Sequence, residues 1–110
     1  VSDSLVQSLD LYPTLIDLCA LQNTETRFPL DGKSLRPVLS NPESSIHQSI
    51  ISYWGTGITA RDKQYRLVTD RKGGKYVDVE LYDLNESPDP ITNLAGQLPH
   101  VADALLDELP

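Results

Sequence analysis

The segment from residue 48 to residue 82 constrains the fold most, because it alternates extended stretches with short turns that contain glycine. The extended stretches are rich in β-branched and aromatic residues, and they cover residues 48–54, 58–61, 65–69 and 77–82. Gly55-Thr56-Gly57 separates the first two, and residues 71–75, which include Gly73 and Gly74, separate the last two. Since turns this short join antiparallel neighbours, the pattern predicts a four-stranded antiparallel sheet.

The last strand and the segment after it predict how this sheet is covered. Val77, Val79 and Leu81 alternate with polar neighbours, so we expect these three side chains on one buried face. Pro99 then opens an amphipathic helix over residues 98–109. Its apolar stripe consists of Leu98, Val101, Ala102, Leu105, Leu106 and Leu109. We therefore expect an α+β fold in which the C-terminal helix covers the sheet.

The N-terminal part of the chain reads as a helical arm. Residues 10–21 form the predicted helix, with Asp10 as its cap and with Leu11, Leu15, Leu18 and Cys19 on one face. A second short helix is expected over residues 34–39, capped by Ser34. The switch from helical to extended pattern predicts a boundary after residue 45. The chain begins with Val1 and contains no Met, so we expect an excised segment of a longer protein.

Composition argues against nucleic acid as a partner and against a membrane span, and it leaves the role of one basic cluster open. The net charge of −7 argues against binding of nucleic acid, and no apolar run is long enough to span a membrane. Six of the nine basic residues nevertheless cluster between residues 61 and 75: Arg61, Lys63, Arg66, Arg71, Lys72 and Lys75. They form either solvated charges that protect strand edges or a small basic surface near an anionic substrate.

No set of residues in the chain assembles a catalytic or metal site. His47 and His100 lie far apart without the carboxylate pairing or spacing that a metal site needs. Cys19, with Leu18 and Leu21 as apolar neighbours, is interpreted as a buried and unreactive side chain. Tyr53 and Trp54 at a strand end beside glycines are the best candidates for a contact surface, although core packing is the commoner use of tryptophan.

Four tracts resemble the C-terminal part of sulfatases of the alkaline-phosphatase superfamily. They are VQSLDLYPTLIDLCAL (6–21), LDGKSLRPVL (30–39), ITARDKQYRLVTD (58–70) and ELYDL (80–84), the last followed by Pro88, Pro90 and TNLA. Among sulfatases they are most similar to iduronate-2-sulfatase-like enzymes. The resemblance implies that residues 1–45 join the large sulfatase domain and that residues 46–110 form the C-terminal subdomain.

The resemblance further implies a parent enzyme that hydrolyses sulfate esters of a sulfated sugar, with Ca²⁺ and a formylglycine residue. The C/S-x-P-x-R motif that yields formylglycine is absent here, since Ala20 and Leu21 follow Cys19. No catalytic or metal role is therefore assigned to this chain, which is expected to be inactive alone. By resemblance its partner is the N-terminal catalytic domain of the same polypeptide. Tyr53, Trp54 and Arg61 are expected at the rim of the substrate pocket.

Two other functions stay open from the sequence. The chain could belong to a related hydrolase of phosphate or phosphonate esters, because this region does not determine which anion the enzyme recognises. It could also be a stand-alone module that binds glycans through Tyr53 and Trp54. The residues themselves do not indicate a compartment, whereas the resemblance implies a periplasmic, secreted or lysosomal parent.

Overall fold

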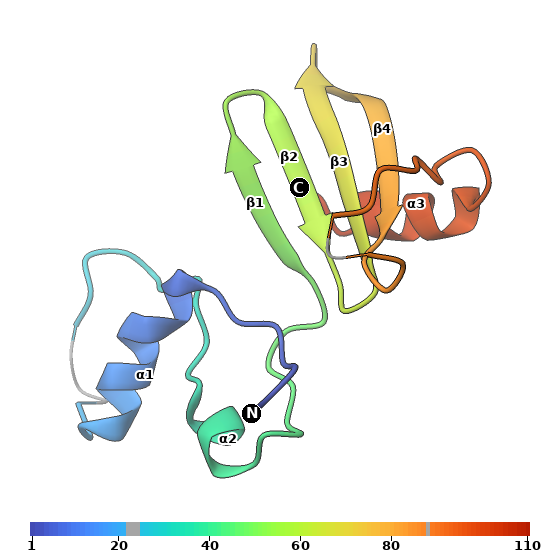
Figure 1. Cartoon of the computed structure of the whole chain (residues 1–110). Helices are drawn as coiled ribbons and strands as arrows, with labels where there is room; N and C mark the ends of the chain where they lie inside the picture. Colours follow the sequence, from blue (N-terminus) through green and yellow to red (C-terminus); the bar gives the residue numbers. More distant parts are fainter. Residues whose placement is uncertain (22–24, 88) are drawn as a thin grey trace. The chain divides into compact units, whose positions relative to one another are not determined.

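The computed structural model describes residues 1–21, 25–87 and 89–110. These residues form two compact units, Val1–Gln48 and Ser49–Pro110, which Figure 1 shows in sequence colours. The first unit consists of short helices and loops, and the second contains a sheet and one helix. The expected α+β fold, with a four-stranded antiparallel sheet, a C-terminal helix and an N-terminal helix, is confirmed.

The sheet is an antiparallel meander in the order β1-β2-β3-β4. Its strands are β1 (Ile50–Trp54), β2 (Gly57–Arg61), β3 (Tyr65–Lys72) and β4 (Lys75–Asp83). Gly73 and Gly74 make the β3–β4 turn with φ angles of 59° and 79°, which glycine adopts without steric cost. Because this turn needs only two residues, the ladder continues to the Lys72–Lys75 pair and both strands are longer than predicted.

A bulge in β4 makes one part of the predicted alternation wrong. Val68 pairs with Glu80 and Asp70 pairs with Val77, so Asp78 and Val79 together lie opposite Thr69. Asp78 has a φ of 53°. Because the bulge adds one residue, the β4 residues that precede it face the opposite side of the sheet from the one that the alternation predicts. Val79 and Leu81 belong to the core side, as expected, but Tyr76 takes the place that the alternation gave to Val77.

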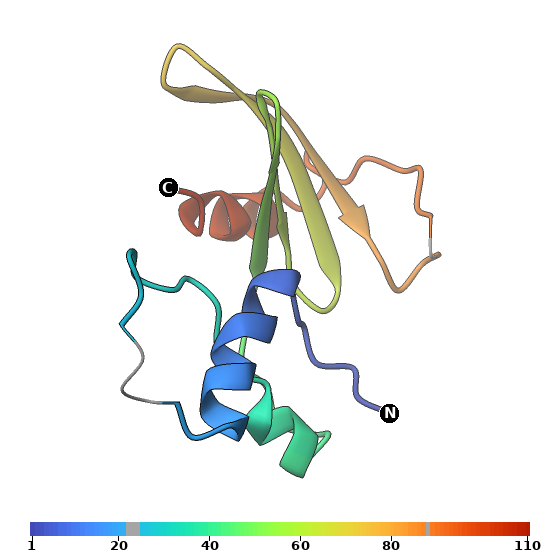
Figure 2. The ribbon, with the colours of Figure 1, turned by 90° about the vertical axis from the view of Figure 1, so that its left-hand side faces the viewer.

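Helix α3 (Pro99–Asp107) crosses one face of the sheet and forms the main core with it (Figure 2). The buried core side chains come from three strands, from α3 and from the residues just after it: Ile58, Ala60, Leu67, Leu81, Ala102, Leu105 and Leu109. The remaining members of the predicted helical stripe, Leu98, Val101 and Leu106, pack against this core. The predicted role of α3 as the cover of the sheet is confirmed.

The opposite side of the sheet, called the outer face, carries the residues that alternate with the core positions. The strand register arranges them in rows across neighbouring strands. One row contains Ile50, Arg61, Arg66 and Tyr82, the next contains Ser52, Thr59, Val68 and Glu80, and the third contains Trp54, Gly57, Asp70 and Val77.

The N-terminal unit contains a 3-10 helix, η1 (Ser8–Asp10), followed by α1 (Leu11–Leu18) and α2 (Arg36–Ser40). Helix α1 is shorter than predicted because Ala20 takes a left-handed φ of 54°. The amides of Ala20 and Leu21 then bond to the carbonyls of Asp17 and Ile16, which closes the helix as a Schellman motif. The predicted end at Leu21 is therefore wrong, and residues 22–24 lie outside the described part.

The start of α2 is also later than predicted. Ser34 lies before the helix, and its hydroxyl accepts a hydrogen bond from the amide of Arg36 at 3.2 Å. The same hydroxyl donates to Asp17 at 2.7 Å, and the Arg36 guanidinium pairs with Asp17 at 3.0 Å. Asp17 thus joins α1 to α2 within this unit.

Candidate functional site

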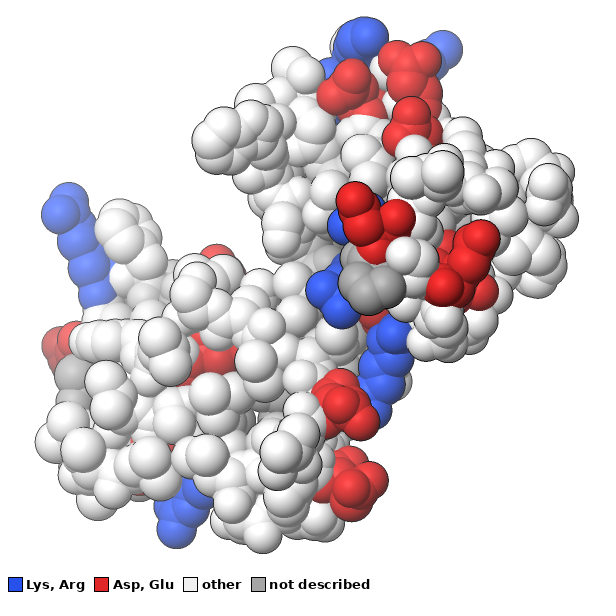
Figure 3. All heavy atoms as spheres, viewed as in Figure 1, with Lys and Arg blue, Asp and Glu red and all other residues white. Residues whose placement is uncertain are grey.

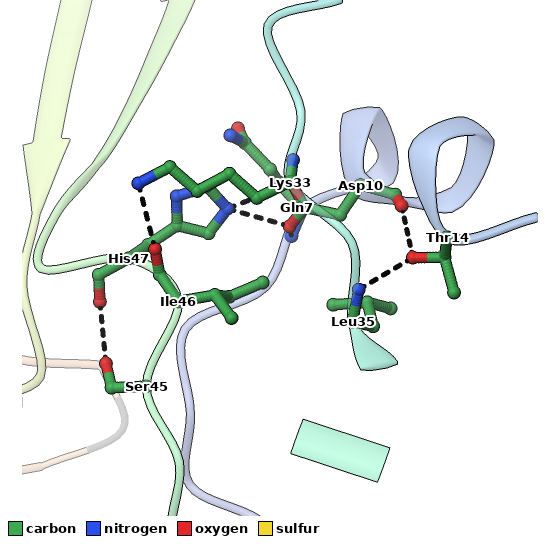
Figure 4. A network of polar contacts seen from close by, with 8 residues as sticks. All are labelled: Gln7, Asp10, Thr14, Lys33, Leu35, Ser45, Ile46 and His47. Carbon is green, nitrogen blue, oxygen red and sulfur yellow. Dashed lines mark hydrogen bonds and ion pairs between the residues drawn. The ribbon is translucent and has the colours of Figure 1, made fainter. Parts of the chain in front are cut away.

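Among the described residues, the most buried polar cluster is centred on Asp10 in the N-terminal unit (Figure 4). Its carboxylate is completely buried and accepts hydrogen bonds from three directions. The amides of Gln7 and Lys33 donate to it at 2.9 Å each, and His47 Nε2 lies 2.9 Å from both carboxylate oxygens. Asp10 therefore occupies the N-cap position of α1, as predicted, but its side chain makes no capping hydrogen bond to α1, because it turns back toward these three groups.

Close backbone packing allows these segments to meet. An added Cβ at Gly32 would lie 1.9 Å from the carbonyl oxygen of Leu9, so only glycine fits beside η1. The Thr14 hydroxyl donates to the Asp10 carbonyl at 2.5 Å and accepts from the Leu35 amide at 2.8 Å. The segment 32–35 is thus fixed to the start of α1 by groups of the DGKSL tract.

The chemistry of this cluster is that of a structural clamp. Burial raises the pKa of Asp10, but hydrogen bonds from the Lys33 and Gln7 amides and the contact with His47 outweigh it, so the pKa lies below the usual range. The hydroxyls of Thr14 and Ser45 already donate to backbone carbonyls. No hydroxyl of the cluster is therefore left as a nucleophile beside His47.

The expectation that both histidines lack a carboxylate partner is wrong for His47. Asp10 lies 37 residues before His47 in the chain, so no local sequence spacing could predict that the two side chains form a pair. His100, in contrast, is exposed in the first turn of α3. No group of three or more His, Cys, Asp or Glu side chains able to hold a metal occurs among the described residues.

The three predicted rim residues do not converge at one point. Trp54 is 91% exposed and lies on the outer face, where its directly opposite partner is Gly57. Arg61 is on the same face but pairs with Ile50, four residues along β1, a separation of about 14 Å. Tyr53 pairs with Ile58 and is 59% exposed on the face that α3 covers.

The cluster of basic residues is divided between the faces and ends of the sheet. Lys72 forms an ion pair with Asp78 at 3.3 Å, and the Arg71 guanidinium lies 5.9 Å from the centre of the Tyr76 ring. Figure 3 shows Lys and Arg side chains interspersed with Asp and Glu over the sheet unit. The basic residues near the β3–β4 turn are therefore partly neutralised within the hairpin itself.

Helix α1 presents an exposed apolar stripe. Leu11, Leu15 and Leu18 are 58%, 58% and 53% exposed, at positions that share one side of the helix. The visible side of this unit in Figure 3 carries few charged side chains. Cys19, predicted to be buried, is instead an exposed free thiol, because it lies just past the last helical residue. An apolar stripe of this size is typical of a surface that contacts another part of a protein.

The tract ELYDL…TNLA holds the loop after β4 against the sheet edge. Asn93 Oδ1 accepts hydrogen bonds from the amides of Leu81 and Ala95, both at 3.0 Å. The Leu94 amide donates to the Leu81 carbonyl at 2.7 Å. This edge of β4 is therefore paired by the following loop, and the tract has a structural use without any catalytic group.

Comparison with known proteins finds that the chain is similar to sulfatases. No protein-family model matches the chain. It is 30% identical to arylsulfatase K of Xenopus laevis over 110 residues, which cover 87% of the chain but 20% of that protein. The chain thus spans about a fifth of the length of the curated relatives it matches.

Solved structures share the fold. A putative sulfatase, yidJ of Bacteroides fragilis, superposes with a TM-score of 0.75 at 19% identity, over 91% of this chain and 23% of that one. BT4656, solved in complex with its substrate D-glucosamine-2-N,6-O-disulfate, gives a TM-score of 0.70 at 20% identity, over 91% and 22%. The closer likeness to iduronate-2-sulfatases stays a prediction. The chain is homologous to about a fifth of a sulfatase, which confirms the resemblance carried by its four tracts.

Proposed function

We propose that this chain is the C-terminal segment of a sulfatase and that the groups performing sulfate ester hydrolysis lie outside it. One observation carries the proposal: 87% of the chain aligns with only 20% of an arylsulfatase. The proposed substrate is a sulfated sugar, which the disulfated glucosamine bound to the structurally similar BT4656 supports. In this view the chain contributes stability and the shape of a pocket rim.

The cofactors expected of a sulfatase do not fit this chain. Among the residues that the structure describes, no three metal-ligating side chains come together to hold Ca²⁺. Cys19, the one cysteine, is followed by Ala20 and Leu21 and lacks the motif from which formylglycine is made. Both cofactors are therefore assigned to the rest of the enzyme, and no catalytic step is derived for the residues present.

The proposed partner of the N-terminal unit is the catalytic domain of the same polypeptide. The exposed leucines of α1 supply an apolar surface suited to burial against protein, and about four-fifths of the length of the relatives lies outside this chain. This partner gives the unit the role of joining the sheet domain to the large domain, as the resemblance implies for residues 1–45.

Tyr53, Trp54 and Arg61 remain the proposed contacts at the pocket rim. Trp54 supports this role best, because an almost fully exposed indole beside Gly55 and Gly57 leaves its ring free to stack on a sugar. Its exposure also favours a second candidate function, a glycan-binding module that acts without the large domain. Titration of the chain with an unsulfated and a sulfated oligosaccharide, followed by Trp54 fluorescence, tests this second function.

Turnover of sulfate esters tests the main proposal. The 110-residue chain should give no turnover with Ca²⁺ present, whereas the longer polypeptide should hydrolyse a sulfated sugar. In the longer polypeptide, Trp54→Ala should raise KM with little change in kcat, while Ile91→Ala, at another highly exposed apolar residue, should change neither. Turnover by the chain alone, or hydrolysis of phosphate esters only by the longer polypeptide, would contradict the proposal.

A further inference from the structure

Two arginines lie side by side on the outer face of the sheet. Arg61 in β2 pairs directly with Arg66 in β3, and Arg66 pairs directly with Tyr82 in β4. The Arg66 guanidinium lies 5.7 Å from the centre of the Tyr82 ring, at the distance of a cation–π contact. Directly opposite like charges destabilise a sheet, so this arrangement needs an explanation.

Neither arginine is neutralised within the described part of the chain. No ion pair or hydrogen bond joins either guanidinium to any described residue, and Arg66 Nε is a buried donor without an acceptor. A buried donor without an acceptor is rare and costs free energy. Among the described residues, the two guanidinium groups thus have no acidic partner.

Two acidic residues close to this pair in the chain and in the strand register, Asp62 and Glu80, have other partners. Glu80 Oε2 accepts the Tyr82 hydroxyl at 2.7 Å, and this hydrogen bond together with burial raises the pKa of Tyr82. The Asp62 carboxylate accepts the amides of Gln64 and Tyr65 and so shapes the β2–β3 turn. These acids hold the ring and the turn in place and leave the two guanidinium groups free.

We propose that Arg61 and Arg66 form a binding site for one oxyanion, a sulfate group, which either a sulfate ester or free inorganic sulfate supplies. Guanidinium groups bind oxyanions through pairs of parallel N–H donors, and two adjacent groups suit a tetrahedral anion with several acceptor oxygens. Tyr82 positions Arg66 through the cation–π contact. The choice of sulfate over other oxyanions rests on the proposed function, whereas the site itself rests on the register and the missing acceptor.

Nuclear magnetic resonance of the 110-residue chain tests the site directly. Sodium sulfate is titrated at constant ionic strength while the Nε–Hε signals of the arginines are followed. We expect saturable shifts at Arg61 and Arg66, and the same shifts with glucosamine 6-sulfate but not with glucosamine if the ester also binds. Shifts with inorganic sulfate alone would assign the site to the free ion. No saturable shift, or tighter binding of phosphate than of sulfate, would overturn the proposal.

Matched variants separate this site from general attraction by positive charge. Arg61→Gln, at an exposed position, and Arg66→Lys, which keeps the charge, should each weaken sulfate binding by about tenfold. The control is Arg71→Gln, because Arg71 also lies over a tyrosine ring but has no second arginine opposite. Equal losses in all three variants would overturn the site. Because binding is measured without turnover, this inference and the proposed function can fail separately. If the longer polypeptide hydrolyses sulfate esters but the 110-residue chain does not bind sulfate, only this inference is refuted.

Discussion

The Nε2 atom of His47 lies 2.9 Å from both carboxylate oxygens of Asp10, although 37 residues separate the two in the chain. Both side chains are buried, and Asp10 also accepts the Lys33 amide. The pair therefore connects η1, the DGKSL loop and the segment that leads to β1. Loss of either partner leaves the other buried with unsatisfied hydrogen-bonding capacity.

We expect His47→Ala to destabilise the N-terminal unit by about 2–3 kcal/mol, since it leaves the buried Asp10 carboxylate without one of its donors. Amide hydrogen exchange, read separately for α1 and for β3, measures this effect in the unit concerned. His100→Ala is the control, because His100 is exposed. Equal protection of α1 in the variant and in the unchanged chain would refute the clamp.

Acid should destabilise the same unit through Asp10. The folded-state pKa of Asp10 is lower than the unfolded value of about 4, so the ionised carboxylate adds stability above that pH. This contribution is lost as the pH falls below about 4 through the folded-state pKa. Asp10→Asn should therefore be less stable near pH 7 and show a flatter decline in acid, measured as the exchange protection of α1. The exposed Asp103→Asn in α3 should keep the original decline.

The sequence predicted those features of the fold that depend on neighbouring residues. Gly73 and Gly74 indicate a tight turn because glycine adopts positive φ angles easily. The leucines of α3 indicate a buried helix face by their spacing. The bulge at Asp78 escaped prediction because it depends on the partner strand, where the buried Thr69 hydroxyl donates to the Val77 carbonyl at 2.7 Å. No pattern within β4 alone shows that contact.

The candidate site escaped prediction for the same reason. Asp10 has the position of a helix cap and His47 that of a residue before a strand, and each assignment is reasonable locally. Only the close approach of Gly32 to Leu9 brings the loop and both side chains together. The stripe of α1 was recognised by its spacing, but its exposure was not, because exposure depends on which other segments cover the helix.

Gly32→Ala should destabilise the N-terminal unit by about 2 kcal/mol or more, since the new Cβ would lie 1.9 Å from the Leu9 carbonyl oxygen and backbone would have to move. The matched control is Gly96→Ala, where no atom lies within 4 Å of an added Cβ. That variant should be neutral or slightly stabilised. Thermal unfolding followed by circular dichroism compares the two, and similar midpoints would contradict the close packing.

Asn93→Ala should destabilise the sheet unit by about 1–2 kcal/mol, because the Leu81 amide at the edge of β4 loses its acceptor. The exchange rate of the Leu81 amide, which Asn93 protects, should rise more than that of the Leu67 amide in β3. Asn85→Ala provides the same change at an exposed residue of the same loop and should leave both rates unchanged. An unchanged Leu81 rate in Asn93→Ala would show that this contact does not hold the loop.

Leu15→Ser should affect stability differently in the 110-residue chain and in the longer polypeptide. In the 110-residue chain Leu15 is 58% exposed, so its replacement should change the unfolding free energy by no more than about 0.5 kcal/mol. In the longer polypeptide, where the stripe is proposed to be buried, the same change should destabilise by about 2–3 kcal/mol through the lost apolar burial. Lys63→Ser, a control outside α1, should have little effect in either protein. A Leu15→Ser variant that behaves alike in both would refute docking through this stripe.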